Sequence, residues 1–327
     1  MQQPIGILLF NLGAPSNLDE VAPFLHELFT DPDIYPARIP VFFKKMIGTA
    51  LARSRIKHSR AIYEAIGGGS PLRDITERQA RKLEEHLNSA GLTAHVEVAM
   101  RYSSPTADES LGKLLAKGIS TLIPLPLYPQ FSTVTTGSSL KVLTQSLEKQ
   151  AGLKILPIID WCGYPPYIEA CARRIEAAVR GAETNSPFQK NERVLLFSAH
   201  SLPLRIIKRG DPYLLQTVHT CQRIASELQT DLPWSLSFQS RADMRRWLRP
   251  STQETLIQLG REGVKSVVIF PVSFVSDHSE TLYEIDIQYK KLAEEAGIKQ
   301  LIRVPSFNDD ADFIGILASL VQQRISR

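Results

Sequence analysis

The chain has 327 residues, 43% of them hydrophobic and 22% charged, the composition of a globular protein with one large or two medium domains. No apolar run reaches the roughly 20 residues of a membrane-spanning helix, and the start, MQQPIGILLFNLGAP, lacks the pattern of a signal peptide. The three cysteines, Cys162, Cys171 and Cys221, have no C-x-x-C spacing. We therefore expect a cytoplasmic protein without a disulfide frame, zinc knuckle or iron–sulfur cluster.

The first predicted strand, residues 6–11, is followed by a basic and apolar segment from Arg38 to Arg60. This segment holds seven Lys and Arg and no acidic residue, although the net charge of the whole chain is only +4. An amphipathic helix with a solvated basic face would account for it. The alternative is peripheral contact with an anionic membrane surface, at the inner face of the membrane, or with an acidic, greasy ligand. We expect no nucleic-acid partner, because no nucleic-acid-binding motif is present.

Further along the chain, predicted strands alternate with predicted helices, which indicates βαβ units and parallel sheets. The strand-like run at residues 92–102 precedes a helical pattern at 106–118, and the run at 234–240 precedes another at 251–263. The strands are continuous apolar runs, whereas the helices have apolar residues at spacings of three and four. We predict an α/β fold.

The chain also contains two similar halves. GILLFNLGAPSNLDEV near the start resembles RVLLFSAHSLPLRII from Arg193, and the block from Lys117 resembles the block from Glu262. Pro126 and Pro271 interrupt the strands of these blocks at the same offset. We predict two Rossmann-like domains, residues 1–160 and 161–327, joined near the Pro pair of 160–167. Because ligands bind outside the carboxyl ends of parallel strands, we expect the domains to share one cleft.

His200 follows a predicted buried strand in FSAHSLP. A histidine beside a core strand is often structural, but its position at a strand end favours a proton acceptor near neutral pH. The G-x-S-x-G pattern of a nucleophile elbow is missing.

The stretch SDHSETLYEID, residues 276–286, places several acidic residues directly after another predicted strand. At about 100° per residue, an α-helix would gather Asp277, Glu280, Glu284 and Gln288 within roughly 60°. A solvated helix face is one explanation. However, like charges four residues apart repel, and a row of oxygen ligands suits a divalent cation in transit.

Small-residue loops and aromatic side chains also fall at the predicted strand ends. The loops IGGGSP (66–71) and STVTTGSS (132–139) match no nucleotide-binding motif, so tight turns or carboxylate-binding hydroxyls explain them equally well. A flat aromatic ligand would suit those apolar and aromatic residues that face the cleft. The candidates are Leu12, Tyr128, Phe131, Trp247 and Phe274.

Taken together, LLFNLGAP, IGGGSP, MRY, YPQFSTVTTGSS, FSAHSLP, FQSR and FVSDHSETLYEID resemble the ferrochelatase family over essentially the whole chain. The resemblance implies two chelatase-type domains, each a four-stranded parallel sheet flanked by helices, with a last helix that can pack on the first domain. It implies insertion of ferrous iron into protoporphyrin IX to form protohaem, with iron as a substrate and no resident cofactor.

The resemblance also implies roles for individual residues. His200 matches the histidine that faces the macrocycle centre, as base or metal ligand, and Glu280 matches its acidic partner. A path for metal or protons is implied for Asp277, His278 and Glu284. Contacts with porphyrin propionates are implied for Arg55, Tyr63, Ser70 and Tyr213. Arg101 and Tyr128 match the opposite face of the pocket, and Trp247 and Phe274 match cleft aromatics.

Two departures from the family pattern affect these expectations. Ala242, Asp243 and Met244 replace the V-G-P that commonly follows QSR, which weakens the assignment of the loop before Trp247. Leu12 stands where members acting on coproporphyrin tend to have tyrosine, which favours protoporphyrin IX. A coproporphyrin III ferrochelatase, a metal-dependent hydrolase using His200, His278 and Glu280, and a porphyrin-binding protein without catalysis stay open as alternatives.

Overall fold

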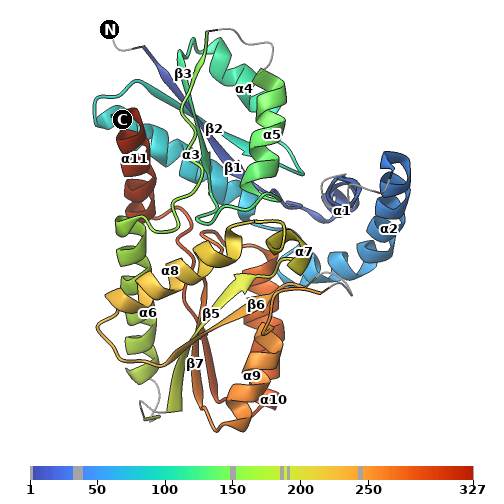
Figure 1. The fold of residues 1–327 in the computed structure, drawn as a ribbon, viewed down its shortest axis with the longest axis vertical. Helices are drawn as coiled ribbons and strands as arrows, with labels where there is room; N and C mark the ends of the chain where they lie inside the picture. The colour runs from blue at the N-terminus through green and yellow to red at the C-terminus, as the bar shows by residue number, and fades with distance from the viewer. Residues whose placement is uncertain are drawn as a thin grey trace.

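The computed structural model describes residues 3–31, 40–147, 152–184, 188–189, 192–241 and 246–326. It contains two parallel sheets of four strands with the same strand order (Figure 1). The first sheet, ordered β2-β1-β3-β4, comprises β1 (Ile5–Asn11), β2 (Ala94–Met100), β3 (Thr121–Pro126) and β4 (Lys154–Ile155). The second, ordered β6-β5-β7-β8, comprises β5 (Arg193–His200), β6 (Trp234–Gln239), β7 (Ser266–Pro271) and β8 (Gln300–Arg303). The predicted α/β fold of two similar halves is confirmed.

Helices flank both sheets, as parallel strands require. In the first half these are α1 (Val21–Thr30), α2 (Val41–Ala65), α3 (Leu72–Ser89), α4 (Ala107–Ala116) and α5 (Thr136–Leu147), with a 3₁₀ turn at Leu18–Glu20. The remaining helices are α6 (Pro165–Thr184), α7 (Leu204–Ile207), α8 (Tyr213–Glu227), α9 (Thr252–Arg261), a π-helix (Glu280–Tyr289), α10 (Lys290–Glu295) and α11 (Ala311–Ile325). In Figure 1, α1 and α2 project from one side of the first half.

The duplication extends to the ends of the helices. Both α4 and α9 begin with a capping box. The hydroxyl of the N-cap residue, Thr106 or Ser251, accepts the backbone N–H of the glutamate three residues later, and the carboxylate of that glutamate accepts the backbone N–H of the N-cap residue. Both helices also end before a glycine with positive φ, Gly118 at 71° and Gly263 at 86°. Glycine adopts this conformation without steric cost, so the chain can turn directly into β3 or β7.

One hydrophobic cluster crosses the boundary between the halves. It includes Ile7 of β1 and Leu195 of β5, together with Phe313 and Leu317 of α11. The last helix packs against α3 of the first half as well as against α6 (Figure 1).

Polar contacts add to this boundary. The carboxylate of Asp211, before α8, accepts hydrogen bonds from the Ser132 hydroxyl at 2.9 Å and the Thr133 N–H at 2.7 Å. The two halves are therefore fixed to each other around the strand ends.

Candidate functional site

The carboxyl ends of β1, β3, β5 and β7 surround one cavity of about 220 Å³, the central cavity. The first half contributes mostly apolar side chains, including Leu12, Phe24 and Leu72. The second half contributes His200 and Glu280. The expected shared cleft is present, and its chemically active groups come from one wall.

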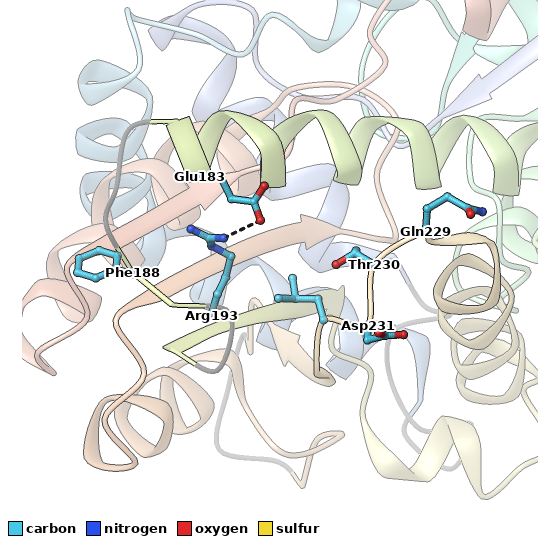
Figure 2. A pocket seen from close by; sticks show the side chains of 7 residues that line it. Glu183, Phe188, Arg193, Gln229, Thr230 and Asp231 are labelled. Atoms are coloured by element: carbon cyan, nitrogen blue, oxygen red, sulfur yellow. Dashed lines mark hydrogen bonds and ion pairs between the residues drawn. The ribbon is translucent and has the colours of Figure 1, made fainter.

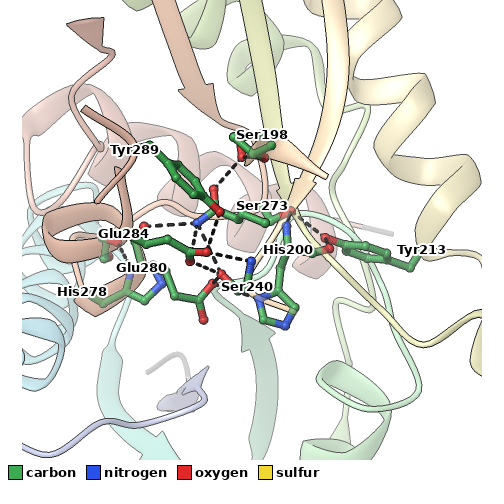
Figure 3. A network of polar contacts seen from close by, with 12 residues as sticks. Ser198, His200, Tyr213, Ser240, Ser273, His278, Glu280, Glu284 and Tyr289 are labelled. Atoms are coloured by element: carbon green, nitrogen blue, oxygen red, sulfur yellow. Dashed lines mark hydrogen bonds and ion pairs between the residues drawn. The ribbon is translucent and has the colours of Figure 1, made fainter. Parts of the chain in front are cut away.

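His200 is the last residue of β5, and its ring is oriented by Glu280 (Figure 3). Nδ1 of His200 lies 2.8 Å from Oε2 of Glu280, and the two side chains are 33% and 25% exposed. An ionised carboxylate can only accept, so Nδ1 holds the proton and Nε2 of the neutral ring is left as the basic nitrogen. Among the described residues, Nε2 has no hydrogen-bond partner.

The backbone of His200 is held by two hydroxyl groups. The Tyr213 hydroxyl donates to the His200 carbonyl at 2.8 Å and lies 2.6 Å from the Ser273 hydroxyl. The Ser273 oxygen in turn accepts the His200 N–H at 3.2 Å. The sequence predicted that Tyr213 contacts a porphyrin propionate. Tyr213 does line the central cavity, but its hydroxyl is hydrogen-bonded to the His200 carbonyl and the Ser273 hydroxyl.

The charges of this pair shift both pKa values. Burial alone would lower the pKa of His200, but the charge of Glu280 and the hydrogen bond to it raise the pKa above its ordinary 6.5. Burial would likewise raise the pKa of Glu280, but the charge of His200 lowers it to about 2. The pair therefore favours imidazolium with carboxylate.

Ser240 connects Glu280 to Glu284, one turn further along the π-helix (Figure 3). Its hydroxyl contacts both carboxyl groups, at 2.7 Å from Glu280, and its N–H donates to Glu284 at 2.9 Å. Burial and the charge of Glu280 raise the pKa of Glu284. The two acidic side chains therefore share one hydroxyl, and Glu284 binds its proton more tightly than an isolated glutamate does.

Two further residues of the acidic stretch have different surroundings. His278 lines the central cavity and its Nδ1 donates to the Ser276 carbonyl at 3.0 Å; burial lowers its pKa, so the ring is neutral. Asp277 does not line this cavity. It pairs with Arg303 at 2.9 Å and accepts from Asn308 at 2.9 Å, so its carboxylate fastens the start of the π-helix to the segment after β8.

The helix that begins at Glu280 is a π-helix, where the sequence periodicity predicts an α-helix. Its hydrogen bonds span five residues, so the turn is wider and the computed α-helical arc does not apply. Asp277 does not lie with the other acidic residues of the predicted helix face, because it precedes the helix and is paired with Arg303. Glu280, Glu284 and Gln288 line a second cavity of about 350 Å³, the acidic cavity, together with Ser240 and His58.

The remaining predicted residues divide into two groups. Leu12, Tyr63, Tyr128 and Phe274 line the central cavity. Burial raises the pKa of Tyr63 to about 12, and the buried Tyr128 hydroxyl has no hydrogen-bond partner among the described residues.

The second group, Arg55, Ser70, Arg101 and Trp247, does not line the central cavity. Arg101 is bound by Asp31 at 2.5 Å and donates to Ser138 at 2.9 Å. The Ser70 hydroxyl accepts the Leu72 N–H at 3.3 Å. Trp247 lines a separate cavity beside Arg246. The departure at residues 242–244 lies outside the described residues.

The structure adds Ser240, Ser273, Gln239 and Tyr289 to the site. Gln239 and Ser240 belong to the FQSR motif, but the sequence assigned a role to none of the four. The amide of Gln239 donates to the Glu280 carbonyl at 3.1 Å, and the Tyr289 hydroxyl donates to Glu284 at 2.5 Å. Gln239 and Ser240 could have been predicted as site residues because they lie at the carboxyl end of β6. In the described ranges no three His, Cys, Asp or Glu side chains form a ready metal site.

Another cavity, of about 340 Å³, lies at the beginning of β5, away from the strand ends that hold His200 (Figure 2). Arg193, 2% exposed, pairs there with Glu183 at 3.1 Å. Gln229 and Asp231 also line it. The described lining includes no histidine or cysteine, and Arg193 is bound by a carboxylate, so we do not place the chemistry there. No helix in the described ranges has the length and apolarity to cross a bilayer.

Sequence comparisons identify relatives along nearly the whole chain. The family model described as Ferrochelatase matches residues 4–325. A protein named Ferrochelatase from Desulfotalea psychrophila is 44% identical, covering 97% of this chain and 96% of that protein. Ferrochelatases from Aquifex aeolicus and Synechococcus sp. (strain RCC307) are each 40% identical, covering 98% of this chain and 99% and 83% of those proteins.

Solved structures share the fold at low identity. SirB from Bacillus subtilis with Fe3+ superposes with a TM-score of 0.56 at 11% identity, covering 99% of this chain and 96% of that one. The sirohydrochlorin chelatase SirB from B. subtilis subspecies spizizenii in complex with cobalt gives 0.55 at 9% identity, covering 99% and 95%. These likenesses support the two-half arrangement alone.

Proposed function

Because the chain belongs to the ferrochelatase family, we propose that it inserts ferrous iron into protoporphyrin IX and that His200 accepts the pyrrole protons. Iron insertion into a porphyrin, a step of haem biosynthesis, is the activity of this chain, which is a metal chelatase of the lyase class. Iron and porphyrin are its substrates. The observation that supports the residue assignment is the His200–Glu280 pair in a cavity built by both halves.

The reaction makes three demands on the protein. Two pyrrole N–H protons must leave the free-base porphyrin, ferrous iron must exchange its water for nitrogen ligands, and the flat ring must present its inner lone pairs to the metal. A preorganised base meets the first demand, and contacts at the periphery of the ring supply binding energy for bending it.

His200 suits the first demand when its ring is neutral. Nδ1–H is directed to Glu280, so Nε2 is the nitrogen that takes a proton, and the carboxylate stabilises the imidazolium that forms. The hydroxyls of Tyr213 and Ser273 fix the backbone from which the ring extends.

Glu280 lines both the central cavity and the acidic cavity, so a small ion can approach it from either cavity. We assign Glu280 and Glu284 to the passage of iron or protons between the acidic cavity and His200, with His278 beside it. The Ser240 contacts to both carboxyl groups support this route.

The apolar wall supports protoporphyrin IX as the porphyrin. Leu12 presents no ligand atom to a metal, and Phe24, Leu28 and Leu72 lie in the same lining. Coproporphyrin III has two additional propionates in place of vinyl groups, and burying a carboxylate against apolar side chains is costly.

Anaerobic absorbance assays with ferrous iron and each porphyrin test this assignment. We expect kcat/KM for protoporphyrin IX to exceed that for coproporphyrin III by at least about tenfold, the effect of one poorly paired buried charge. Leu12→Tyr and Leu12→Phe provide matched variants, because the introduced side chains differ only by the hydroxyl, and Leu12→Phe should retain the preference. Faster insertion into coproporphyrin III by the unchanged protein would reject protoporphyrin IX as the substrate.

Location and cofactors complete the proposal. We propose a cytoplasmic protein that touches a membrane surface through the start of α2, where Phe42, Phe43 and Met46 are exposed. Lys45, Arg53 and Lys57 are basic residues nearby on the same helix, whereas Lys44 is buried. We propose no iron–sulfur cluster, in keeping with the burial of all three cysteines, which raises the pKa of each thiol.

A further inference from the structure

The cavity that Trp247 lines has a volume of about 300 Å³, lies beside the acidic cavity and has the opposite charge. We call it the arginine cavity. Its lining includes Trp247, Ser201, Ser251 and three arginines, Arg241, Arg246 and Arg249. No acidic residue belongs to its described lining, and Glu254, just outside, pairs with Arg249 at 2.5 Å.

The arginines extend from a backbone that is held in place. The Arg246 carbonyl accepts the Leu204 N–H at 2.8 Å, and the Leu248 N–H donates to the Leu202 carbonyl at 3.0 Å. Trp247 forms a β-bridge with Pro203 between these two bonds. Within the described ranges, Arg241 and Arg246 have no carboxylate partner in an ion pair. A guanidinium on a fixed backbone can bind a carboxylate through two parallel hydrogen bonds.

The arginine cavity adjoins the proposed route to His200. Phe238, Arg241 and Ser251 line both it and the acidic cavity, and the acidic cavity is also lined by Glu280 and Glu284. A bare ferrous ion would be repelled by the arginines, whereas an anion that encloses the ion would be attracted to them. The two cavities together therefore suit a negatively charged carrier that places a cation at the acidic side.

We propose that the arginine cavity binds a small polycarboxylate, and that this anion presents ferrous iron to the adjacent acidic cavity. The volume fits a small molecule rather than a macromolecular segment. Iron would move by ligand exchange: bonds to the carrier's oxygens break as bonds to Glu284 and Glu280 form, and the metal stays ferrous. The delivery step rests on the proposed function, but the binding step does not.

Isothermal titration with metal-free citrate tests the binding step. We expect saturable binding to the unchanged protein. Arg246→Gln should weaken it at least about tenfold, as loss of a charge-assisted hydrogen-bond pair does, and Arg246→Glu should weaken it further. Arg261→Glu, at the other end of α9, makes the same charge change at an exposed position and should bind citrate normally. Absence of binding to the unchanged protein, or equal binding by all variants, would overturn the proposal.

Insertion assays test the delivery step, with iron supplied either as ferrous citrate or as the aqueous ion. Arg246→Glu should slow insertion from ferrous citrate several-fold while the rate from the aqueous ion is not reduced. Equal slowing from both sources would refute delivery through this cavity. A protein that binds citrate normally but inserts no iron from either source would instead contradict the proposed function.

Discussion

His200 illustrates how a neighbouring charge selects the reactive form of a side chain. Glu280 fixes the tautomer with the proton on Nδ1, and it also raises the pKa of the ring. The same carboxylate therefore keeps a proton on the ring at low pH and would stabilise the imidazolium that the proposed proton transfer forms. Since only the neutral ring accepts a proton, insertion should speed up as pH rises through the raised His200 pKa.

Glu280→Gln should move this pH dependence in a defined direction. Without the charge of Glu280, the effect of burial on His200 is opposed less and the pKa of the ring falls, so the acidic limb of kcat/KM shifts to lower pH. The maximal rate should fall at least about tenfold, because the imidazolium loses its partner. The pH–rate profiles of both proteins give the answer, and an unshifted limb would remove Glu280 as the partner of His200.

At the residue scale the sequence predicted the important pair but not its support. His200 and Glu280 lie in motifs whose position at strand ends indicates a site. Ser240 and Ser273 act through hydroxyl contacts between β6, β7 and the π-helix, and no spacing along the chain encodes such contacts. Arg101 resembles a pocket residue in sequence, yet Asp31, far from it along the chain, binds its guanidinium.

At the scale of elements, the π-helix depends on the anchor at its first turn. Asp277 accepts hydrogen bonds from Arg303, Ser306 and Asn308, which belong to β8 and the segment after it. Periodicity did not predict this helix, because π-helices are rare and an amphipathic pattern is read as an α-helix by default. The strands, by contrast, were predictable as continuous apolar runs that end at Pro126 and Pro271.

Asp277→Asn should destabilise the fold more than it slows chemistry. Burial would raise the pKa of Asp277, but Arg303 and three hydrogen bonds lower it, so its stabilising effect is present above pH 4 and is lost as pH falls through the folded-state value. The two side chains are 17% and 14% exposed, and breaking such a pair should cost about 3 kcal/mol at pH 7. Urea unfolding at pH 7 and near pH 3 measures this, and a loss that persists undiminished in acid would contradict it.

The exposed start of α2 makes a second prediction at this scale. Phe42 is 71% exposed and Phe43 is 50% exposed, next to basic residues on the same helix. Each phenylalanine side chain inserted into a bilayer contributes about 2 kcal/mol. Phe42→Ser with Phe43→Ser should therefore reduce sedimentation with anionic vesicles more than tenfold, while insertion into detergent-dispersed porphyrin persists. Unchanged vesicle binding would exclude this face.

At the scale of the whole molecule, duplication explains both the fold and the location of the site. Two halves with the same strand order direct the carboxyl ends of β1, β3, β5 and β7 into one cavity. The matching positions of Pro126 and Pro271 in the two similar blocks of sequence made this arrangement predictable. The position of Trp247 was not predictable, because the loop before it departs from the family pattern. Trp247 lines the arginine cavity and not the central cavity.

The central claim is that His200, at the end of β5 in the cavity shared by both halves, removes the pyrrole protons. Measuring iron insertion and porphyrin binding by His200→Ala under anaerobic conditions tests it most directly. We predict that insertion falls at least about a hundredfold, as expected for loss of a general base, while porphyrin fluorescence shows binding within a few-fold of the unchanged protein. Normal turnover by His200→Ala would contradict the claim.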